Sequence, residues 1–225
     1  PTMMTSNGVL RTPPVVTNLL IINVLVFLAE ILLPGSVSNR LMDFGALHFW
    51  AGGGFHIWQP LTYMFLHANF SHILFTMFAL WMFGRGLEYE MGSRRFPTYY
   101  LVCGVGAALI QLGVNWLEYS AMLSSGTASP AALWSYAHAT TIGASGAVFG
   151  LLLAFGMMHP NSVIMLVFPP IALKAKWFVI IYGAIELLAG VSGTGGGVAH
   201  FAHLGGMLFG WLLLRWWKKR GRIYY

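Results

Sequence analysis

Six long runs of apolar residues dominate the chain, and the polar residues gather in the segments between them. A helix needs about 20 predominantly apolar residues to cross a bilayer. The windows that meet this length, to within a few residues, are Val15–Leu33, Pro60–Gly84, Phe96–Leu117, Ala139–Met158, Ala175–Val191 and Val198–Trp217. The pattern therefore predicts an all-α membrane protein built as a bundle of six transmembrane helices.

The segments between these runs are predicted to be loops. Three of them follow odd-numbered spans and so share one side of the membrane, namely Pro34–Gln59, Glu118–His138 and Ser192–Gly197. A further apolar run, Val163–Leu173, is too short to span and contains two adjacent prolines, so we expect a loop lying at the membrane surface. The expected organisation is an N-terminal segment over 1–14, one membrane domain over 15–217 and a basic tail over 218–225.

The composition excludes an ordinary cytosolic globule. Hydrophobic residues make up 57% of the 225 residues and charged residues only 8%, whereas soluble domains carry about 25% charged residues. The single cysteine excludes an internal disulfide and any metal site built from several cysteines. The composition is instead that of a multi-pass protein of a bacterial inner or plasma membrane.

The basic residues orient the predicted spans. If the N-terminus is cytoplasmic, eleven of the twelve Lys and Arg residues lie on the cytoplasmic side and only Arg40 lies outside. The positive-inside rule therefore predicts that both termini are cytoplasmic. The net charge of +6 then reflects membrane orientation and contact with anionic lipid, and nucleic acid is not an expected partner.

Three polar side chains share the outer half of the predicted bundle. In the predicted orientation the second, fourth and sixth spans run from outside to inside, and their outer halves carry His72, Ser145 and His203. Ser145 and His203 lie at nearly the same depth, roughly 9 Å into their windows at 1.5 Å per residue. A polar group in hydrocarbon is costly unless it is paired or faces water, so these three residues are candidates for a functional site.

Ser145 lies in the motif Gly143-Ala144-Ser145-Gly146, which Gly150 follows. A serine hydroxyl becomes a nucleophile when a neighbouring base takes its proton, and the flanking glycines leave its oxygen accessible. The alternative interpretation is a packing face of small residues, Gly146-x-x-x-Gly150, with the serine bonded to its own helix.

His203 opens the motif His203-Leu204-Gly205-Gly206, with Gly210 one turn later. The two glycines four residues apart form a second small-residue face, which can dock on the one beside Ser145 and bring the imidazole to the hydroxyl. Imidazole titrates near neutral pH and can accept and then donate a proton. A metal pair with His200 is the alternative, but we expect no carboxylate or cysteine at the matching depth, and therefore no metal.

His72 and Thr76 are four residues apart and so lie on one face of the second span. Both can donate a hydrogen bond, which an oxyanion hole requires beside the nucleophile's own backbone N–H. The alternative is that His72 ties the first loop predicted to face outside (Pro34–Gln59, the first outer loop) to its helix, a task for which His67 is better placed. Glu186 is interpreted as scaffold, and Asp43 as too distant, so a catalytic dyad is expected.

These motifs together resemble the rhomboid family of intramembrane serine proteases. The resemblance covers roughly Trp58 to Gly210. The segment from Trp58-Gln59-Pro60-Leu61-Thr62 through His67 and His72 to Gly84, Glu88 and Gly92 is similar to the family's first loop and second helix. Gly143-Ala144-Ser145-Gly146 resembles its nucleophile motif, and His203-Leu204-Gly205-Gly206 resembles its base motif.

The resemblance implies a Ser145–His203 dyad in a water-filled cavity open to the outside. His72 and the Ser145 amide would be the oxyanion donors, with Thr76 and Gly143 beside them. The implied substrate is a single transmembrane helix of another protein, which enters sideways, unwinds near the outer face and is cut after a small residue. The family uses no metal or organic cofactor, so none is expected.

Two residues depart from the family pattern. Thr76 stands where the family usually has asparagine, and Gln59 where it commonly has arginine. One alternative function is therefore a rhomboid-fold protein that binds membrane clients without cutting them; Thr76 favours it slightly, and the retained serine and histidine count against it. A small transporter or channel is disfavoured because the spans show no inverted repeat and no series of acids.

Overall fold

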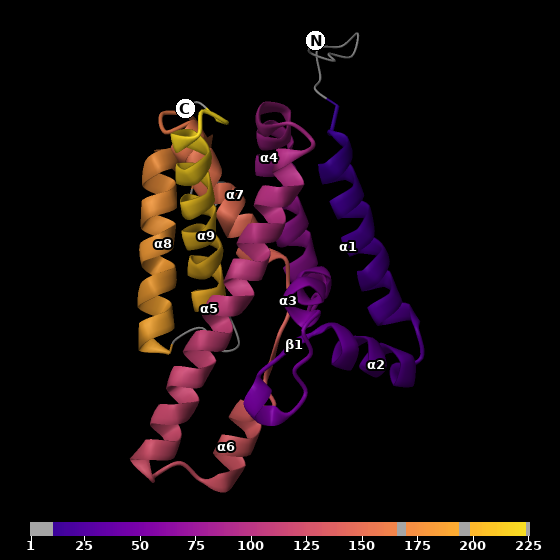
Figure 1. Cartoon of the computed structure of the whole chain (residues 1–225). Helices are drawn as coiled ribbons and strands as arrows, with labels where there is room; N and C mark the ends of the chain where they lie inside the picture. Colours follow the sequence, from indigo (N-terminus) through magenta and orange to yellow (C-terminus); the bar gives the residue numbers. More distant parts are fainter. Residues whose placement is uncertain (1–10, 166–169, 194–198, 224–225) are drawn as a thin grey trace.

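The computed structural model describes residues 11–165, 170–193 and 199–223. Helices make up most of this part of the chain, and the long ones run roughly along one axis (Figure 1). The α-helices are α1 (Pro14–Leu32), α2 (Gly35–Gly45), α3 (Gln59–Thr62), α4 (Phe70–Met91), α5 (Arg95–Ser125), α6 (Pro130–Ala137), α7 (Ser145–Met158), α8 (Ala175–Ser192) and α9 (His200–Lys219). Short 3-10 helices cover η1 (Trp50–Gly52) and η2 (Tyr63–Phe65).

Each predicted span overlaps one of six helices, namely α1, α4, α5, α7, α8 and α9, and α4 and α5 continue past the predicted ends of their spans to Met91 and Ser125. Within the described residues, α1, α4, α5 and α8 are long and apolar enough to cross a membrane, which makes the protein a multi-pass membrane protein. The apolar α7 has 14 residues, or about 21 Å at 1.5 Å per residue. Helix α9 is longer but carries two histidines and Arg215. Six full crossings therefore remain a prediction.

The second span begins at Phe70, and the predicted start at Pro60 was wrong. Residues Gln59–Phe65 form the separate short helices α3 and η2. The side chain of Asn69 then caps α4 by accepting a hydrogen bond of 2.9 Å from the backbone N–H of His72. Such a cap satisfies one of the N–H groups that lack a partner in the first helical turn, so the helix starts at Phe70.

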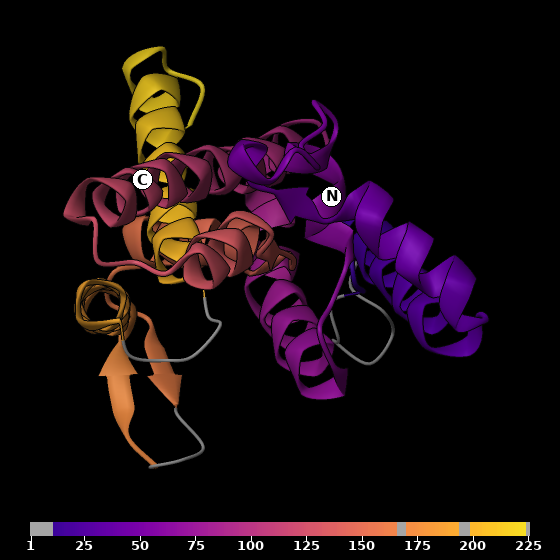
Figure 2. The ribbon, with the colours of Figure 1, turned by 90° about the horizontal axis from the view of Figure 1, so that it is seen from below.

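Two small antiparallel sheets correct the all-α prediction. Strands β1 (Leu47–His48) and β2 (Thr140–Thr141) pair, which joins the first outer loop to the segment just before Ser145. Strands β3 (Val163–Met165) and β4 (Ala172–Lys174) also pair, so the predicted surface loop is a hairpin whose residues 166–169 lie outside the described part. Figure 2 shows this hairpin projecting sideways beside α8.

Close packing of α5, α7 and α9 forms the centre of the molecule. A Cβ added at Gly206 of α9 would overlap the carbonyl oxygen of Gly146 in α7, and one added at Gly150 would overlap the Cys103 sulfur of α5. Only glycine lets these backbones approach so closely. The predicted docking of the two small-residue faces is thus confirmed, although Gly210 faces Tyr99 and Cys103 of α5 instead of α7.

The first outer loop is organised around Gln59, which is fully buried. Its side-chain oxygen accepts hydrogen bonds from the backbone N–H groups of His48 and His56 at 3.2 and 3.0 Å. Its side-chain nitrogen donates to the carbonyl of Gly54 at 3.0 Å. The amide thus holds both ends of a turn, which a residue carrying only donors could not do in the same way.

A second buried polar residue, Glu88, joins α4 to the start of α1. Its carboxylate accepts hydrogen bonds from the backbone N–H groups of Val15 at 3.1 Å and Val16 at 2.8 Å, and from the Ser93 hydroxyl at 2.7 Å. A carboxylate at a helix N-terminus satisfies N–H groups that have no partner within the helix and complements the positive end of the helix dipole.

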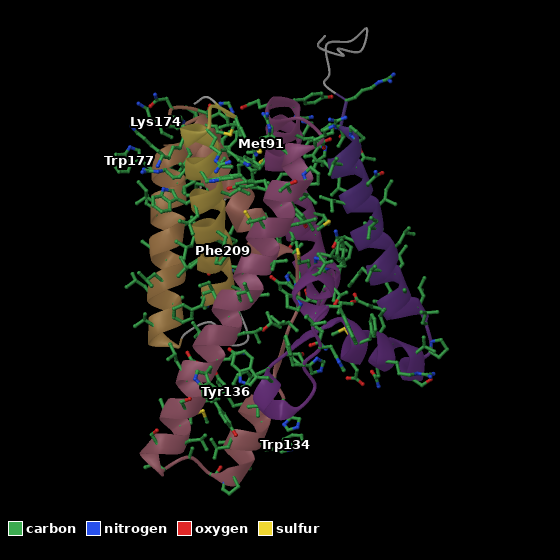
Figure 3. The ribbon with its side chains drawn as sticks, viewed as in Figure 1. Met91, Trp134, Tyr136, Lys174, Trp177 and Phe209 are labelled. Carbon is green, nitrogen blue, oxygen red and sulfur yellow. The ribbon has the colours of Figure 1, made fainter. Side chains whose placement is uncertain are left out.

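The start of α1 and the end of α9 lie at the same end of the bundle (Figure 1). Figure 3 places Met91 and Lys174 at that end, and Trp134 and Tyr136 of α6 at the opposite end. Helix α2 and strand β1 also lie toward the end of α6. This arrangement agrees with both termini being on one side of the membrane, and which side remains a prediction.

Candidate active site

Ser145 is the first residue of α7 and is half-buried. Its position follows from Gly143, whose φ of +121° turns the chain into the helix. As the first helical residue it has a backbone N–H without a partner inside the helix, and it sits at the positive end of the α7 dipole. A negative charge that develops next to this serine is therefore favoured.

His203 lies in the first turn of α9 and meets the serine directly. Its Nε2 is 2.8 Å from the Ser145 Oγ, within hydrogen-bond distance. His203 is 9% exposed, and its ring stacks on Phe149 of α7 at 4.1 Å between ring centroids with 5° between the planes. The structure thus brings together the hydroxyl and the imidazole that the sequence singled out, and it fixes the plane of the base.

A carboxylate that the sequence analysis left out completes the cluster. Glu186 Oε2 of α8 lies 2.8 Å from His203 Nδ1 and 2.7 Å from His200 Nδ1, and Glu186 is 6% exposed. The expectation of no carboxylate at the depth of the two histidines was therefore wrong, and Glu186, interpreted from the sequence as scaffold, contacts the predicted base. The sequence could have indicated this contact, because Glu186 lies less than two turns before the C-terminal end of α8 and His203 lies in the first turn of the next, antiparallel helix.

His72 approaches the serine from the first turn of α4. The backbone N–H of Ala68 donates to His72 Nδ1 at 3.3 Å, so the neutral ring carries its proton on Nε2. A Cβ added at Gly143 would lie 2.8 Å from that Nε2 and 3.8 Å from the Ser145 Oγ. The N–H of His72 is therefore placed beside the nucleophile, and any side chain at position 143 would displace it.

The other two predicted site residues contribute in ways that the sequence did not indicate. The backbone N–H of Gly143 donates to the Tyr63 carbonyl at 2.9 Å, so this amide is not offered to a substrate, and the residue serves by lacking a side chain. The Thr76 hydroxyl donates to the backbone carbonyl of His72 at 2.7 Å. Its one proton is thus directed into its own helix and away from the serine.

His67 supports His72 from the segment before α4. It is 3% exposed, and its ring packs edge-on against His72 at 5.1 Å between centroids. Burial, together with the neighbouring His72, lowers the pKa of His67 to about 4. His67 is therefore neutral near pH 7, and its two ring nitrogens are buried without a hydrogen-bond partner among the described residues. That it ties the preceding loop to α4 stays a prediction.

Two cavities in the described part of the chain lie away from the serine. One of about 300 Å³ is lined by the first outer loop and the end of α6, including Asp43, His48 and His138. The other, of about 430 Å³, lies between α1, α2 and the start of α4, and includes Glu30 and His67. Neither is lined by Ser145, so the water-filled cavity at the site remains a prediction.

Comparisons with known proteins give one consistent result. Residues 54–219 match the Rhomboid domain family. The chain is 28% identical over 203 residues to rhomboid protease AarA of Providencia stuartii, covering 87% of this chain and 69% of that protein. It is 29% identical to mitochondrial rhomboid protein 1 of Saccharomyces cerevisiae and 32% identical to chloroplastic rhomboid-like protein 11 of Arabidopsis thaliana, each over 69% of this chain. The matches cover 42% and 52% of those two relatives, so the chain spans about half of their length.

Proposed function

Because the chain belongs to the rhomboid family, we propose that it is an intramembrane serine endopeptidase that cleaves single transmembrane-helix substrates near the outer face of the membrane. The observation that carries the proposal is the 2.8 Å contact between the Ser145 hydroxyl and the His203 imidazole. A nucleophile and a base within hydrogen-bond distance are the minimum that acyl transfer requires.

In the first half of the proposed reaction, Ser145 Oγ attacks the carbonyl carbon of the scissile peptide bond while its proton passes to His203 Nε2. The carbonyl oxygen becomes an oxyanion, which accepts hydrogen bonds from the Ser145 backbone N–H and from His72 Nε2–H. The dipole of α7 adds a further favourable term. The His203 imidazolium then gives its proton to the departing amine as the C–N bond breaks, leaving an ester on Ser145.

In the second half, water hydrolyses this ester. His203 Nε2 takes a proton from the water as the water oxygen attacks the ester carbonyl, and the same two N–H groups donate hydrogen bonds to the second oxyanion. Collapse of the intermediate returns the proton to Ser145 Oγ and releases a carboxylate product. The proposed reaction consumes one water.

The proposed substrates follow from where the site lies. Ser145, His72 and His203 all occupy the first turns of their helices, at the ends directed toward the outer loops. A substrate helix that reaches them from the lipid must unwind locally, because a helical carbonyl already accepts a backbone hydrogen bond. The proposed protein partners are therefore membrane proteins with a single helix that unwinds near the surface, in a bacterial inner or plasma membrane.

Reporter cleavage tests the proposal. Purified wild type is expected to cut a reporter that carries a single transmembrane helix and to react with a fluorophosphonate probe, and Ser145→Ala is expected to lose both. Ser71→Ala is the matched control, since Ser71 is an exposed serine at the same end of the bundle and should leave both signals intact. Wild type that neither cuts the reporter nor takes up the probe would refute the protease assignment.

The hydrogen bond of Thr76 favours one alternative, a rhomboid-fold protein that binds membrane clients without cutting them. Its hydroxyl bonds within α4, so a donor that the family usually supplies at this position is missing. Co-purification of a membrane client with wild type and Ser145→Ala alike, without any cleavage product, would support this alternative over the protease.

A further inference from the structure

We propose that Glu186 is the positioning residue of a Ser145–His203–Glu186 triad, in which its carboxylate holds His203 in the form that can take the serine proton. The inference rests on the proposed protease function and deepens it. It adds a third member, contributed by α8, to a site that would otherwise be a dyad of α7 and α9.

The first argument is the direction of the hydrogen bonds. Glu186 Oε2 lies 2.8 Å from His203 Nδ1 and 2.7 Å from His200 Nδ1. An ionised carboxylate can only accept, so each Nδ1 carries a proton. A neutral His203 then has its lone pair on Nε2, which is the atom that faces the Ser145 hydroxyl at 2.8 Å. The carboxylate thus selects the tautomer that acts as a base.

The second argument is burial. Glu186 is 6% exposed in a helix whose other side chains are mostly apolar. A buried carboxylate is costly unless charged or polar partners satisfy it, and here two imidazoles supply the donors. When His203 takes the serine proton, its positive charge forms next to this carboxylate and is stabilised. The group therefore acts at the step where charge develops.

The third argument is the orientation of the ring. Phe149 stacks on one face of His203 and is itself stacked on Tyr182 of α8, at 5.2 Å between centroids. Stacking fixes the plane of the imidazole, and the bond to Glu186 fixes its rotation within that plane. Both constraints are needed to keep Nε2 on the hydroxyl, because a ring flip would exchange the two nitrogens.

Proton transfer in the triad balances without a change at Glu186. The proton that leaves Ser145 Oγ goes to His203 Nε2, while the Nδ1 proton stays on the imidazole and the carboxylate stays ionised. The other titratable groups that face the pair are His200 on α9, Tyr182 on α8 and His72 on α4. A pH profile of the triad must therefore be compared with that of a His200 variant.

The test compares kcat, KM and the pH profile of kcat/KM for variants of the full chain. For Glu186→Gln we expect kcat to fall by about 10²–10⁴-fold, because the amide can donate to Nδ1 and select the wrong tautomer. KM should change little, since Glu186 does not touch the substrate. The acidic limb of kcat/KM should move to lower pH, because a neutral partner no longer favours the imidazolium. Glu186→Asp, which keeps the charge, should recover part of kcat.

Two controls separate positioning from folding. Glu88→Gln makes the same change at a buried carboxylate that bonds to α1 and Ser93, so it should lower Tm without moving the pH profile. His200→Ala removes the second donor to Glu186, and it should leave the acidic limb closer to wild type than Glu186→Gln does. If Glu186→Gln does not fold, Glu186→Asp provides the test instead. The triad predicts that its kcat is lower than that of wild type while its KM is unchanged, because the shorter side chain moves the carboxylate away from His203 Nδ1.

Three results would overturn the inference while leaving the protease function intact. The first is a Glu186→Gln variant whose kcat and pH profile equal those of wild type. The second is a fall in kcat that is explained by a lower Tm alone, as expected for Glu88→Gln. The third concerns a metal, because Glu186, His200 and His203 offer ligand atoms within 4.8 Å of one another. Stoichiometric zinc binding that Glu186→Gln abolishes, with the pH profile unmoved, would identify a metal site instead. Failure of the protease function itself would show differently, as a wild type no more active than Ser145→Ala.

Discussion

The Thr76 hydroxyl shows how one hydrogen bond decides what a residue can contribute. Its proton goes to the carbonyl of His72, 2.7 Å away in the same helix. Back-bonding of this kind is the usual fate of a threonine within a helix. The side chain that stands where the family usually has asparagine thus helps to fix the helix that bears His72. In the proposed mechanism the oxyanion is therefore left to His72 and the Ser145 amide.

Replacing Thr76 by asparagine should therefore raise kcat. An asparagine amide reaches farther than a hydroxyl and can add a donor to the oxyanion, and one such donor is typically worth on the order of 10²–10³ in rate. We expect a gain in kcat below that range, because the neighbouring residues are not arranged to position an asparagine amide. Thr76→Val is the matched comparison and should stay near wild type. An unchanged or lower kcat in Thr76→Asn, measured by reporter cleavage, would contradict this account.

His67 should make the stability of the protein depend on pH. Burial, with a smaller effect of His72, lowers the pKa of His67 from its ordinary 6.5 to about 4. The unfolded chain then binds a proton that the folded chain does not, so stability is fully present above pH 6.5 and is lost as the pH falls toward 4. The expected loss is on the order of 2 kcal/mol relative to His67→Phe, which cannot titrate. Equal pH dependence of unfolding in the two proteins would rule out His67 as the cause.

At the scale of elements, three helix N-termini converge on the serine. Helices α4, α7 and α9 each place one site residue in their first turn. The glycine contacts between α7 and α9 decide how close the two elements come, and hence whether the imidazole reaches the hydroxyl. The geometry of the site is therefore a property of helix packing as much as of the residues that carry the chemistry.

Gly206→Ala should separate α7 from α9. The added Cβ would overlap the carbonyl oxygen of Gly146, so the helices must move apart. Overpacking of this kind costs about 1–3 kcal/mol, and we expect a lower Tm together with a strong loss of cleavage. Gly86→Ala in α4 is the control, because a Cβ there meets nothing within 4 Å and should raise stability by about 0.5–1 kcal/mol. Wild-type Tm and activity in Gly206→Ala would show that the contact is not needed.

For the molecule as a whole, the distribution of basic residues predicts its orientation in the membrane. The start of α1 and the end of α9 lie at one end of the bundle, and α2 and α6 lie toward the other (Figure 1). Eleven of the twelve basic residues are assigned to the end that holds the termini, which the positive-inside rule places in the cytoplasm. In this predicted orientation the candidate active site faces the outside, where the substrate is proposed to unwind.

Single cysteines can test this orientation, because the native Cys103 is fully buried and should not react. A membrane-impermeant maleimide should label Ser36→Cys in α2 in intact bacterial spheroplasts. It should label Lys219→Cys at the end of α9 only after lysis, and both positions are exposed. The reverse pattern would invert the predicted orientation and move the active site to the cytoplasmic face.

The sequence by itself determined where the apolar helices lie, to within a few residues for most of them, and it predicted Ser145, His203 and His72 as candidate site residues. Hydropathy is a sum over neighbouring residues, so an apolar span can be predicted from its own segment of the sequence. Serine and histidine beside glycines are unusual in a helix that only contacts lipid, so these motifs indicate a functional site. Hydropathy alone misplaced the start of α4. The apolar run begins at Pro60, but the residues before Asn69 form the short helices α3 and η2, and α4 begins only at Phe70.

Only the tertiary structure decided which side chains meet. Glu186 joins His203 because α8 and α9 are antiparallel neighbours, and Thr76 is withdrawn because its proton goes to its own helix. The strand pairs β1–β2 and β3–β4 likewise depend on partners distant in sequence or beyond a turn. Hydrogen bonds act over about 3 Å and depend on angle, so these contacts are set by how helices pack against one another, which no pattern along a single segment contains.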